Sequence, residues 1–458
     1  LISLDTFRAD CINSSPRSGA YKSKHNDTVP LAPTVLDELL KSSVYYNNCI
    51  SAAPYTSASH GAYFTGIGPL HNGLYEFFNR RLKKPTIFQL AKKQGYRSIF
   101  QTDFPIMLGP YLGISDDVDS YHIEDEEAAF KELERNGKNK TLSFFHFGGI
   151  HYPYGFHTLK FGGDAYRKKV ASLEKKYGIA KYQKTKLDDV LDETFRSKED
   201  SQLLLRYKFI VQKLYKEQKY DDLFNLYLEG INYFMKHRFD KFLKKILNFM
   251  DKNNAVLILF SDHGEEWDSR SEGHHNSTDD NVLRVPLIVY RKGITPRIEN
   301  SLVRTVDLAP TVLNELPNPS VPAEIEGEKL NYFSALLPNQ KLHAISQVWT
   351  SIATKREISS YQKAAIKHKR SSAPLKTFLN AEVARNSRIK LTRYYDRKGA
   401  TVSSTIDVST KSNVIKKTAM STLTKVLKKY NAKKLAVKKI SSIEARLREE
   451  FSNLGYRV

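Results

Sequence analysis

Short apolar runs alternate with amphipathic stretches along the chain, which is the first indication of its fold. Apolar runs that predict strands lie at 1–4, 44–50, 97–101 and 285–290, and amphipathic stretches that predict helices lie at 33–42, 57–65 and 86–94. This alternation is typical of a parallel sheet with helices on its faces. We therefore expect an α/β fold with a mostly parallel sheet.

Two further apolar runs mark where chemistry is expected. The run 255–260 holds six apolar residues without a break, as expected of a central parallel strand, and 141–147 is a second short strand. Asp262 follows the first run and His151 the second, as Asp5 follows the strand at 1–4. Ligands of open α/β sheets bind at the carboxyl ends of strands. We therefore expect these side chains to lie at one edge of the sheet.

The later parts of the chain predict an insertion and a second unit. Charged helical patterns fill about 160–235 and predict a helical insertion, and 203–250 predicts a long amphipathic helical stretch whose aromatic residues belong to the core. Beyond them, 389–395 and 401–408 predict an antiparallel hairpin and 440–451 a final helix. We expect a catalytic α/β domain over 1–340 and a smaller α+β subdomain over 341–458.

Composition narrows the class of protein only a little. The 458 residues are too many for one compact core, and no apolar run is long enough for a transmembrane helix. Two cysteines, Cys11 and Cys49, exclude a disulfide framework and a structural zinc site, and do not decide the compartment. We expect the chain to begin inside its first strand, so a signal peptide cannot be judged and the localisation stays open.

The positive charge is concentrated at one end of the chain. The net charge is +22, and residues 351–458 hold 26 Lys and Arg against 7 Asp and Glu. Such a segment can attract polyanions or an anionic membrane surface. The simpler alternative, a solvated lysine-rich face, is favoured because aromatic residues that would stack on a polymer are sparse there.

Asp5 and the pair Asp262–His263 are candidate ligands of a divalent cation. A carboxylate suits a hard cation, and the pair offers adjacent oxygen and nitrogen ligands. Alternatives stay open from the local sequence: an aspartate after a strand is often a turn former or a cap, and an Asp-His pair is common by chance.

Thr56 is a candidate nucleophile. It begins the stretch Thr56-Ser57-Ala58-Ser59-His60, where a helix is predicted to start. A hydroxyl at a helix N-terminus points toward a natural anion site. Judged by its neighbours alone, Thr56 fits a helix N-cap better than a nucleophile.

Four histidines are candidates for acid–base or anion-binding roles. His151 can protonate a leaving oxygen, and His60 can hold or orient the nucleophile. For both, a buried histidine bonded to the backbone is an equally good alternative. His274 and His275 can contact a substrate anion, and one of the two is expected to lie in a surface loop because adjacent side chains seldom share a target.

Taken in order, these segments resemble the sulfatase family of the alkaline phosphatase superfamily. The likeness covers about residues 1–340 plus the tail, and its segments are 4–10, 33–37, 56–66, 85–86, 95–98, 151–154, 261–265, 283–289, 306–311 and 453–456. So many ordered segments are improbable by chance. The resemblance implies an alkaline-phosphatase-like α/β fold and a metal-dependent enzyme.

The resemblance also implies roles for individual residues. It makes Asp5, Asp262 and His263 ligands of one divalent cation, with Thr56 as the nucleophile that also touches the metal. The cation is Mn, Ca, Zn or Mg, and the ligand types do not choose among them.

The histidines gain roles from the same resemblance. His60 matches the basic residue that follows the nucleophile, and His151 the histidine near the leaving group. For the basic residue that contacts the substrate, His275 aligns best and His274 is the second choice.

Two departures from the family pattern bear on the reaction. Most sulfatases carry Cys or Ser at the position of Thr56 and convert it to formylglycine, an aldehyde that threonine cannot form. The second Asp of the usual Asp-Asp pair is Thr6. Both departures resemble the threonine-using branch, which includes phosphoethanolamine and phosphoglycerol transferases and related phosphodiesterases. We therefore expect hydrolysis or transfer at a phosphate ester.

Two other functions stay open. One is that of a sulfuric ester hydrolase proper, and the other, of a different class, is a non-catalytic sulfatase-like protein that binds polyanions. The substrate is expected to be an anionic ester, with a glycan, a lipid head group and a polymer all possible as its carrier. Specificity is expected in the segments at about 105–140, 155–200 and 340–400. The sequence does not predict an oligomeric state.

Overall fold

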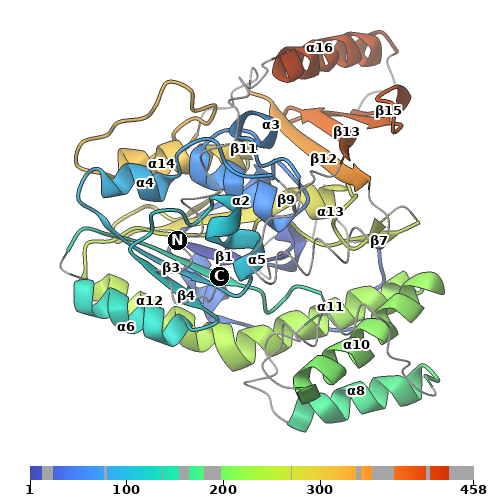
Figure 1. Ribbon diagram of the computed structural model, residues 1–458, viewed down its shortest axis with the longest axis horizontal. Coiled ribbons are helices and arrows are strands. Elements are labelled where there is room, and N and C mark those ends of the chain that lie inside the picture. Colours follow the sequence, from blue (N-terminus) through green and yellow to red (C-terminus); the bar gives the residue numbers. More distant parts are fainter. Residues whose placement is uncertain are drawn as a thin grey trace.

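The computed structural model (Figure 1) shows a layered α/β molecule with a second, smaller sheet near its C-terminal end. The residues it describes are 1–12, 24–76, 80–137, 139–152, 154, 164–179, 198–269, 271–336, 342–352, 376–408 and 413–432.

A nine-stranded sheet forms the centre of the molecule. Its strands are β1 (Ile2–Leu4), β2 (Val44–Ile50), β3 (Arg97–Thr102), β4 (Ser120–Ile123), β5 (Thr141–Phe147), β6 (Leu257–Phe260), β9 (Arg284–Tyr290), β10 (Arg297–Glu299) and β11 (Val303–Arg304). They lie in the order β10-β2-β9-β6-β1-β5-β3-β4, with β11 also paired to β2. Every pairing is parallel except those of β9, which runs antiparallel to β2 and β6. The predicted mostly parallel sheet is confirmed.

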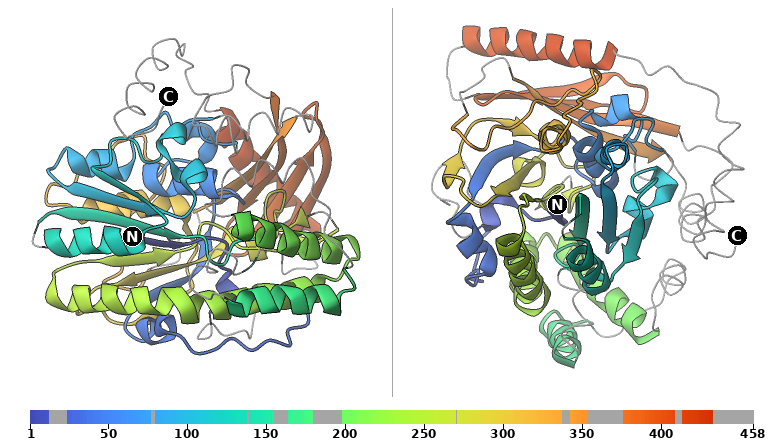
Figure 2. Two further views of the ribbon diagram at one scale, coloured as in Figure 1. Left: turned by 60° about the horizontal axis from the view of Figure 1, so that its bottom comes forward. Right: turned by 90° about the vertical axis from the view of Figure 1, so that its left-hand side faces the viewer.

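Helices cover both faces of this sheet (Figures 1 and 2). On one face lie α2 (Thr56–Thr65), α3 (Pro69–Asn72), α4 (Ile87–Lys92) and α14 (Leu308–Asn314). On the other lie α1 (Val35–Leu40), α6 (Glu126–Asn136), α11 (Tyr220–Phe234) and α12 (Asp240–Lys252). Each face has its own buried apolar cluster, as expected of a sheet whose central strands are buried on both sides.

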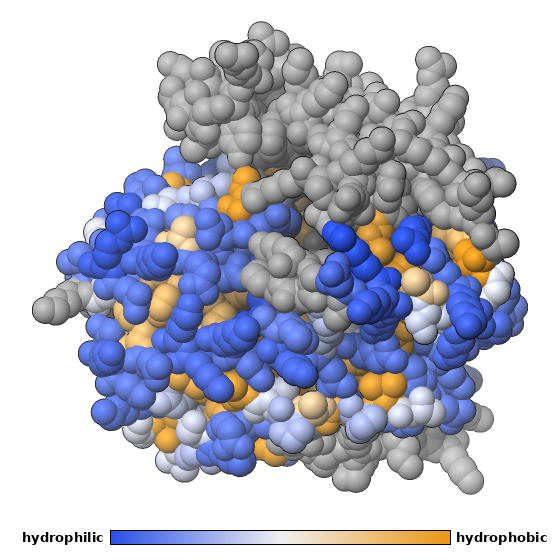
Figure 3. Space-filling model, turned by 90° about the horizontal axis from the view of Figure 1, so that it is seen from below, coloured by the Kyte–Doolittle hydropathy of each residue, from blue (hydrophilic) through white to orange (hydrophobic). Residues whose placement is uncertain are grey.

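Local sequence signals explain where several helices begin and which side they bury. Thr34 and Thr86 each start a helix with a capping box. Helix α12 buries Phe242 and Ile246 and turns its charged residues outward. The face seen in Figure 3 is accordingly mostly hydrophilic where it is coloured.

The predicted insertion contains α8 (Asp164–Lys176), α10 (Lys198–Lys216) and α11, which a π-helical turn, η4 (Met235–Phe239), joins to α12. The stretch predicted at 203–250 is helical but not continuous. It breaks between α10 and α11, where Gln218 has a φ of 55°. Residues 160–163 and 180–197 of the insertion lie outside the described residues.

The second sheet is antiparallel and consists of β12 (Ala344–Ile352), β13 (Lys376–Arg385), β14 (Ile389–Tyr395) and β15 (Thr401–Val408). Helix α16 (Asn413–Ala432) packs on it through Leu423 and Leu427. The predicted hairpin is confirmed, β12 and β13 were not predicted, and the helix at 440–451 lies outside the described residues. The boundary between 340 and 341 stays a prediction.

The other elements of the described residues are short: η1 (Ala9–Cys11), α5 (Pro105–Leu108), η2 (Pro110–Leu112), β7 (Trp267–Asp268), β8 (Ser271–Glu272), α13 (Asp280–Leu283) and η5 (Thr305–Asp307). None of the described helices is both long and apolar enough to span a bilayer.

Candidate active site

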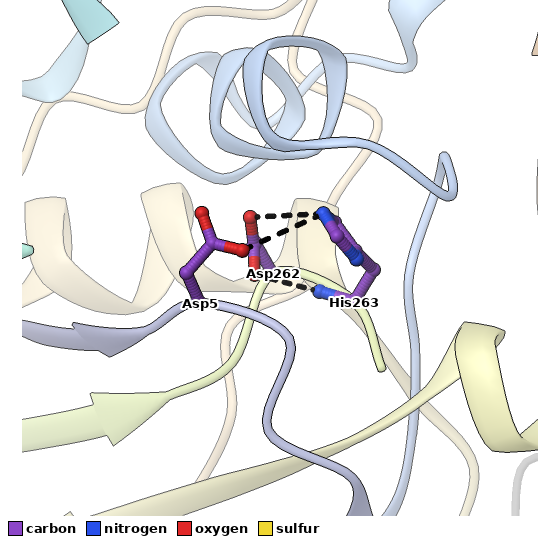
Figure 4. Close-up of side chains that lie close together, drawn as sticks. All are labelled: Asp5, Asp262 and His263. Atoms are coloured by element: carbon purple, nitrogen blue, oxygen red, sulfur yellow. Dashed lines mark hydrogen bonds and ion pairs between the residues drawn. The ribbon is translucent and has the colours of Figure 1, made fainter. Parts of the chain in front are cut away.

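Asp5, Asp262 and His263 meet at the carboxyl edge of the central sheet, as predicted. Asp5 follows β1, and the other two follow β6, its parallel neighbour. Figure 4 shows the three side chains turned toward one another. Nε2 of His263 lies 3.4 Å from Oδ2 of Asp262 and 3.8 Å from Oδ1 of Asp5. One ligand atom from each residue lies within 4.8 Å of the other two.

The free atoms of this group fit a divalent cation. Oδ1 of Asp5 and Oδ2 of Asp262 are buried, and neither accepts a hydrogen bond from any described residue. Nδ1 of His263 lies 3.0 Å from the carbonyl of Gly264 and donates to it, so the lone pair of Nε2 is left for a ligand. Burial raises the pKa of Asp5 to about 6 and also raises the pKa of Asp262. A cation held between these atoms would offset the cost of two buried carboxylates.

Backbone contacts hold the two ligand loops against each other. The Thr6 amide donates to Oδ1 of Asp262 at 3.2 Å, and Thr6 itself has a φ of 60°. The Asp262 carbonyl accepts the hydroxyls of Ser51 at 2.6 Å and Ser59 at 2.7 Å. Ser59 belongs to α2, so the same contacts fix the position of that helix over the metal ligands.

The Thr56 hydroxyl faces the candidate metal site. It donates to Oδ2 of Asp5 at 3.2 Å and lies 3.5 Å from Nε2 of His263. Thr56 is the first residue of α2, and the N-cap is Tyr55, which makes no side-chain cap. The Thr56 side chain therefore does not serve as the helix cap that its neighbours favoured.

His60 braces the backbone of Thr56 and does not reach its hydroxyl. Its Nδ1 donates to the Thr56 carbonyl at 2.8 Å, and its Nε2 accepts the Ser3 hydroxyl at 2.9 Å. Burial lowers the pKa of His60 to about 3, although Asp262, whose Oδ2 lies 3.6 Å away, acts in the opposite direction. The ring is thus neutral and fully engaged in positioning the start of α2.

The remaining predicted histidines gather beside the metal ligands. The His274 ring lies 4.2 Å from the His263 ring, 4.1 Å from His275 and 5.2 Å from His151, between centroids. Nδ1 of His274 donates to the buried Glu265 at 3.1 Å, and its buried Nε2 has no hydrogen bond. His274 is therefore the one turned inward, whereas the adjacent His275 is exposed. Only one of the pair is buried, as the sequence led us to expect.

One residue of the site was not singled out from the sequence. His146 is buried in β5, and its Nε2 donates to Oδ2 of Asp5 at 3.1 Å. Its Nδ1 lies 3.4 Å from the hydroxyl of Thr102 in the neighbouring β3. Burial lowers its pKa to about 4, so the ring is neutral. The sequence signal that could have identified His146 is its position inside the apolar run Phe144–Phe147, because histidine is uncommon in a strand that only packs in the core.

Comparison with known proteins identifies the family. The Sulfatase family model matches residues 1–316. The chain belongs to the sulfatase family. As a member of this family, the protein is a hydrolase that acts on sulfate or phosphate esters. The predicted sulfatase family is confirmed, and so is the prediction that the protein is an enzyme.

Several solved structures share the fold. One was solved in complex with its substrate D-glucosamine-2-N,6-O-disulfate; it is 16% identical, with 94% of this chain and 98% of that chain covered and a TM-score of 0.61. The phosphonate monoester hydrolase of Agrobacterium radiobacter is 12% identical, with 95% of each chain covered and a TM-score of 0.57. A Bacteroides thetaiotaomicron protein linked to glycosaminoglycan metabolism is 16% identical, with 93% and 95% covered and a TM-score of 0.56. No curated protein sequence matches the chain.

Proposed function

We propose that this sulfatase-family protein cleaves or transfers a phosphate ester through Thr56 and one divalent cation. The observation that carries the proposal is the position of the Thr56 hydroxyl, within 3.5 Å of both Asp5 and His263 and beside two unsatisfied carboxylate oxygens. Asp5, Asp262, His263 and Thr56 would hold the cation. When bound, it would lower the pKa of the hydroxyl and neutralise charge on the non-bridging oxygens of the ester.

The residues then have distinct tasks. The Thr56 hydroxyl gives its proton to solvent water, and its oxygen then forms a bond to phosphorus while the bond to the leaving alcohol breaks. His151 supplies the proton that the leaving oxygen takes up. Water or a second alcohol then gives a proton to His151 and attacks phosphorus, the bond from phosphorus to the Thr56 oxygen breaks, and that oxygen takes up a proton from solvent and becomes the hydroxyl again. Hydrolysis and transfer differ only in this last acceptor.

Substrate binding falls to the adjacent histidine pair. Glu265 fixes the orientation of His274, whose unpartnered Nε2 offers a hydrogen-bonding atom next to the metal ligands. His275, which is exposed, would contact a more distant part of the substrate anion. His60 keeps Thr56 at the start of α2 and takes no part in proton transfer.

The identity of the nucleophile favours phosphate over sulfate esters. Formylglycine is an aldehyde, and the Cβ of threonine bears a methyl group that an aldehyde cannot keep. A sulfate ester would thus have to react without the formylglycine aldehyde, whereas a phosphate ester can react with the threonine oxygen directly. Solved relatives act on a sulfated glucosamine and on phosphonate monoesters, so both classes of ester belong in the test.

The first prediction concerns Thr56 itself. Thr56→Ala removes the attacking oxygen, so we expect turnover of phosphomonoester, phosphodiester and sulfate ester substrates to fall by at least about a thousandfold, while the folded state survives. The measurement is initial rates with Mn, Mg, Ca and Zn added in turn, with circular dichroism as the check on folding.

A matched variant removes the next hydroxyl along the helix. The hydroxyl of Ser57 is buried and makes no hydrogen bond, so Ser57→Ala should keep wild-type rates. Turnover by Thr56→Ala at the wild-type rate would disprove the proposal, whereas no turnover by either protein would favour the non-catalytic, polyanion-binding alternative. Mass spectrometry of the peptide that contains Thr56 gives a second check, because an aldehyde there would contradict the proposed chemistry.

A further inference from the structure

The two carboxylate oxygens of Asp5 have different surroundings. Oδ2 accepts the Thr56 hydroxyl at 3.2 Å and the Nε2–H of His146 at 3.1 Å. Oδ1 is buried, accepts no hydrogen bond from the described residues and lies 3.8 Å from Nε2 of His263. The carboxylate is therefore held through one oxygen, while the other faces the remaining side chains of the candidate metal site.

Both the backbone and the ring of His146 are fixed by their neighbours. The His146 amide donates to the side-chain carbonyl of Gln101, in the adjacent strand β3, at 3.1 Å. The rings of His60 and Phe104 pack against the imidazole, with centroids 5.4 Å and 5.3 Å away. The residue is completely buried. The imidazole therefore has little room to turn away from Asp5.

A second hydrogen bond determines which ring nitrogen of His146 carries the proton. The Thr102 hydroxyl accepts the Phe104 amide at 2.9 Å, and its own proton is directed to Nδ1 of His146 at 3.4 Å. A neutral imidazole that accepts at Nδ1 carries its proton on Nε2, the nitrogen that faces Oδ2 of Asp5. The other tautomer would place the lone pair of Nε2 against a carboxylate oxygen. Thr102 thus makes His146 a donor to Asp5.

We propose that His146 is a positioning residue for the metal centre: its Nε2–H holds Oδ2 of Asp5, so that Oδ1 is presented to the cation. The inference rests on the proposed function, because it requires a cation at this place. In the proposed reaction the Thr56 hydroxyl loses its proton and can no longer donate to Oδ2. Within the described part of the chain, His146 is then the donor that keeps Asp5 in its orientation.

The test measures the affinity for Mn by isothermal titration calorimetry at pH 7, independently of turnover. His146→Leu removes the N–H donor, and the dissociation constant should rise about ten- to a hundredfold, as is typical when the partner of a metal ligand is lost. His146→Gln places an amide N–H close to where Nε2 of the ring lies, so it should bind Mn within about threefold of wild type. A residue that only fills space in the core would not be rescued by the polar glutamine.

Two further variants complete the test. Thr102→Val removes the hydroxyl that fixes the tautomer but leaves His146 in place, and it should weaken Mn binding by about three- to tenfold even if His146→Leu does not fold. His122→Leu is the matched control, because His122 lies in β4 of the same sheet, 3.0 Å from Glu132, and should leave Mn affinity unchanged.

The outcomes separate this inference from the proposed function. Wild-type Mn affinity in His146→Leu or in Thr102→Val, or an equal loss in His146→Leu and His146→Gln, would overturn the positioning role and leave the proposed function standing. No binding of Mn by the wild-type protein would overturn both.

Discussion

At the scale of single residues, the candidate metal site depends on two buried carboxylate oxygens that accept no hydrogen bond from the described residues. Asp5 and Asp262 are both 0% exposed, and each keeps one oxygen without a hydrogen bond. Such atoms are costly unless a cation binds them, because a buried carboxylate loses its hydration. Metal affinity and proton affinity are therefore in competition at the same oxygens.

That competition predicts how metal binding depends on pH. In the metal-free protein burial raises the pKa of Asp5 from 3.8 to about 6, although His263 and Thr56 oppose the shift. Below about pH 6 a proton occupies the carboxylate that the cation needs. We expect the metal dissociation constant to rise about tenfold for each pH unit below 6 and to level off above 7. Calorimetric titration with Mn at pH 5, 6, 7 and 8 measures this.

The raised pKa of Asp5 also makes the free energy of unfolding of the metal-free protein depend on pH. Between about pH 4 and 6 the folded, metal-free chain keeps a proton on Asp5 that the unfolded chain has lost, so this group makes the free energy of unfolding fall as pH rises. A bound divalent cation displaces the proton from Asp5, so the free energy of unfolding of the metal-bound protein no longer falls for this reason as pH rises. The increase in melting temperature on adding metal should consequently grow from pH 5 to pH 7, and a constant increase would contradict the assignment of Asp5 as a ligand.

Residues next to strand ends were predictable, whereas residues brought in by pairing were not. Asp5, Asp262 and His263 directly follow apolar runs, so the sheet alone places them. The position of His146 beside Asp5 depends on the register of β5 against β1. This register cannot be inferred from local sequence, because the two strands lie far apart along the chain.

At the scale of elements, the π-helical turn between α11 and α12 places the guanidinium of Arg238 deep inside the protein. Arg238 of this turn is 4% exposed and binds Asp103, at the end of β3, at 2.6 Å and Glu126, at the start of α6, at 2.7 Å. Burial alone would raise the pKa of Asp103, but Arg238 holds it well below its usual value. Asp103 in turn accepts the Gly148 amide at 2.9 Å, at the start of the loop that carries His151.

Removing the positive charge of Arg238 should destabilise the fold strongly. Arg238→Met leaves two buried carboxylates without a counter-charge, and we expect a loss of about 3–5 kcal/mol in the free energy of unfolding. Lys245→Met is the matched control, since its pair with Glu127 is exposed and should contribute only about 0–1 kcal/mol. Urea unfolding followed by circular dichroism measures both, and equal losses would show that the buried network is not structural.

The helices of this region show what periodicity can and cannot predict. Apolar spacing correctly predicted helix over 203–250 and its role in the core. It did not predict the turn at Gln218 or the π-helical turn at Met235–Phe239, because neither changes which residues are apolar.

At the scale of the whole molecule, alternation of strands and helices was sufficient to predict the main sheet but not its exception. The reversed direction of β9 depends on pairing with β2 and β6, which local pattern does not encode. The second sheet was predicted only as a hairpin. Its strand β12 contacts the segment that precedes Thr56, where the Gln347 amide donates to the Ala52 carbonyl at 3.0 Å, and the positive charge of this part of the chain did not indicate that contact.

A cluster of charges holds this second sheet to the catalytic part, and it provides the last prediction. Oδ1 of Asp280, the first residue of α13, lies 2.6 Å from Lys390 of β14 and 2.8 Å from Arg385 of β13. Burial acts to raise the pKa of Asp280, but the two cations lower it to about 2. The stabilisation is therefore complete above about pH 4 and is lost as pH falls toward 2.

Asp280→Asn should cost about 1–2 kcal/mol at pH 7, because the group is partly exposed, and clearly less at pH 3. Asp407→Asn, an exposed carboxylate of β15, should change little at either pH. Denaturant unfolding of both variants at the two pH values measures this, and a loss for Asp280→Asn that is equal at pH 3 and pH 7 would rule out the ion pairs as its cause.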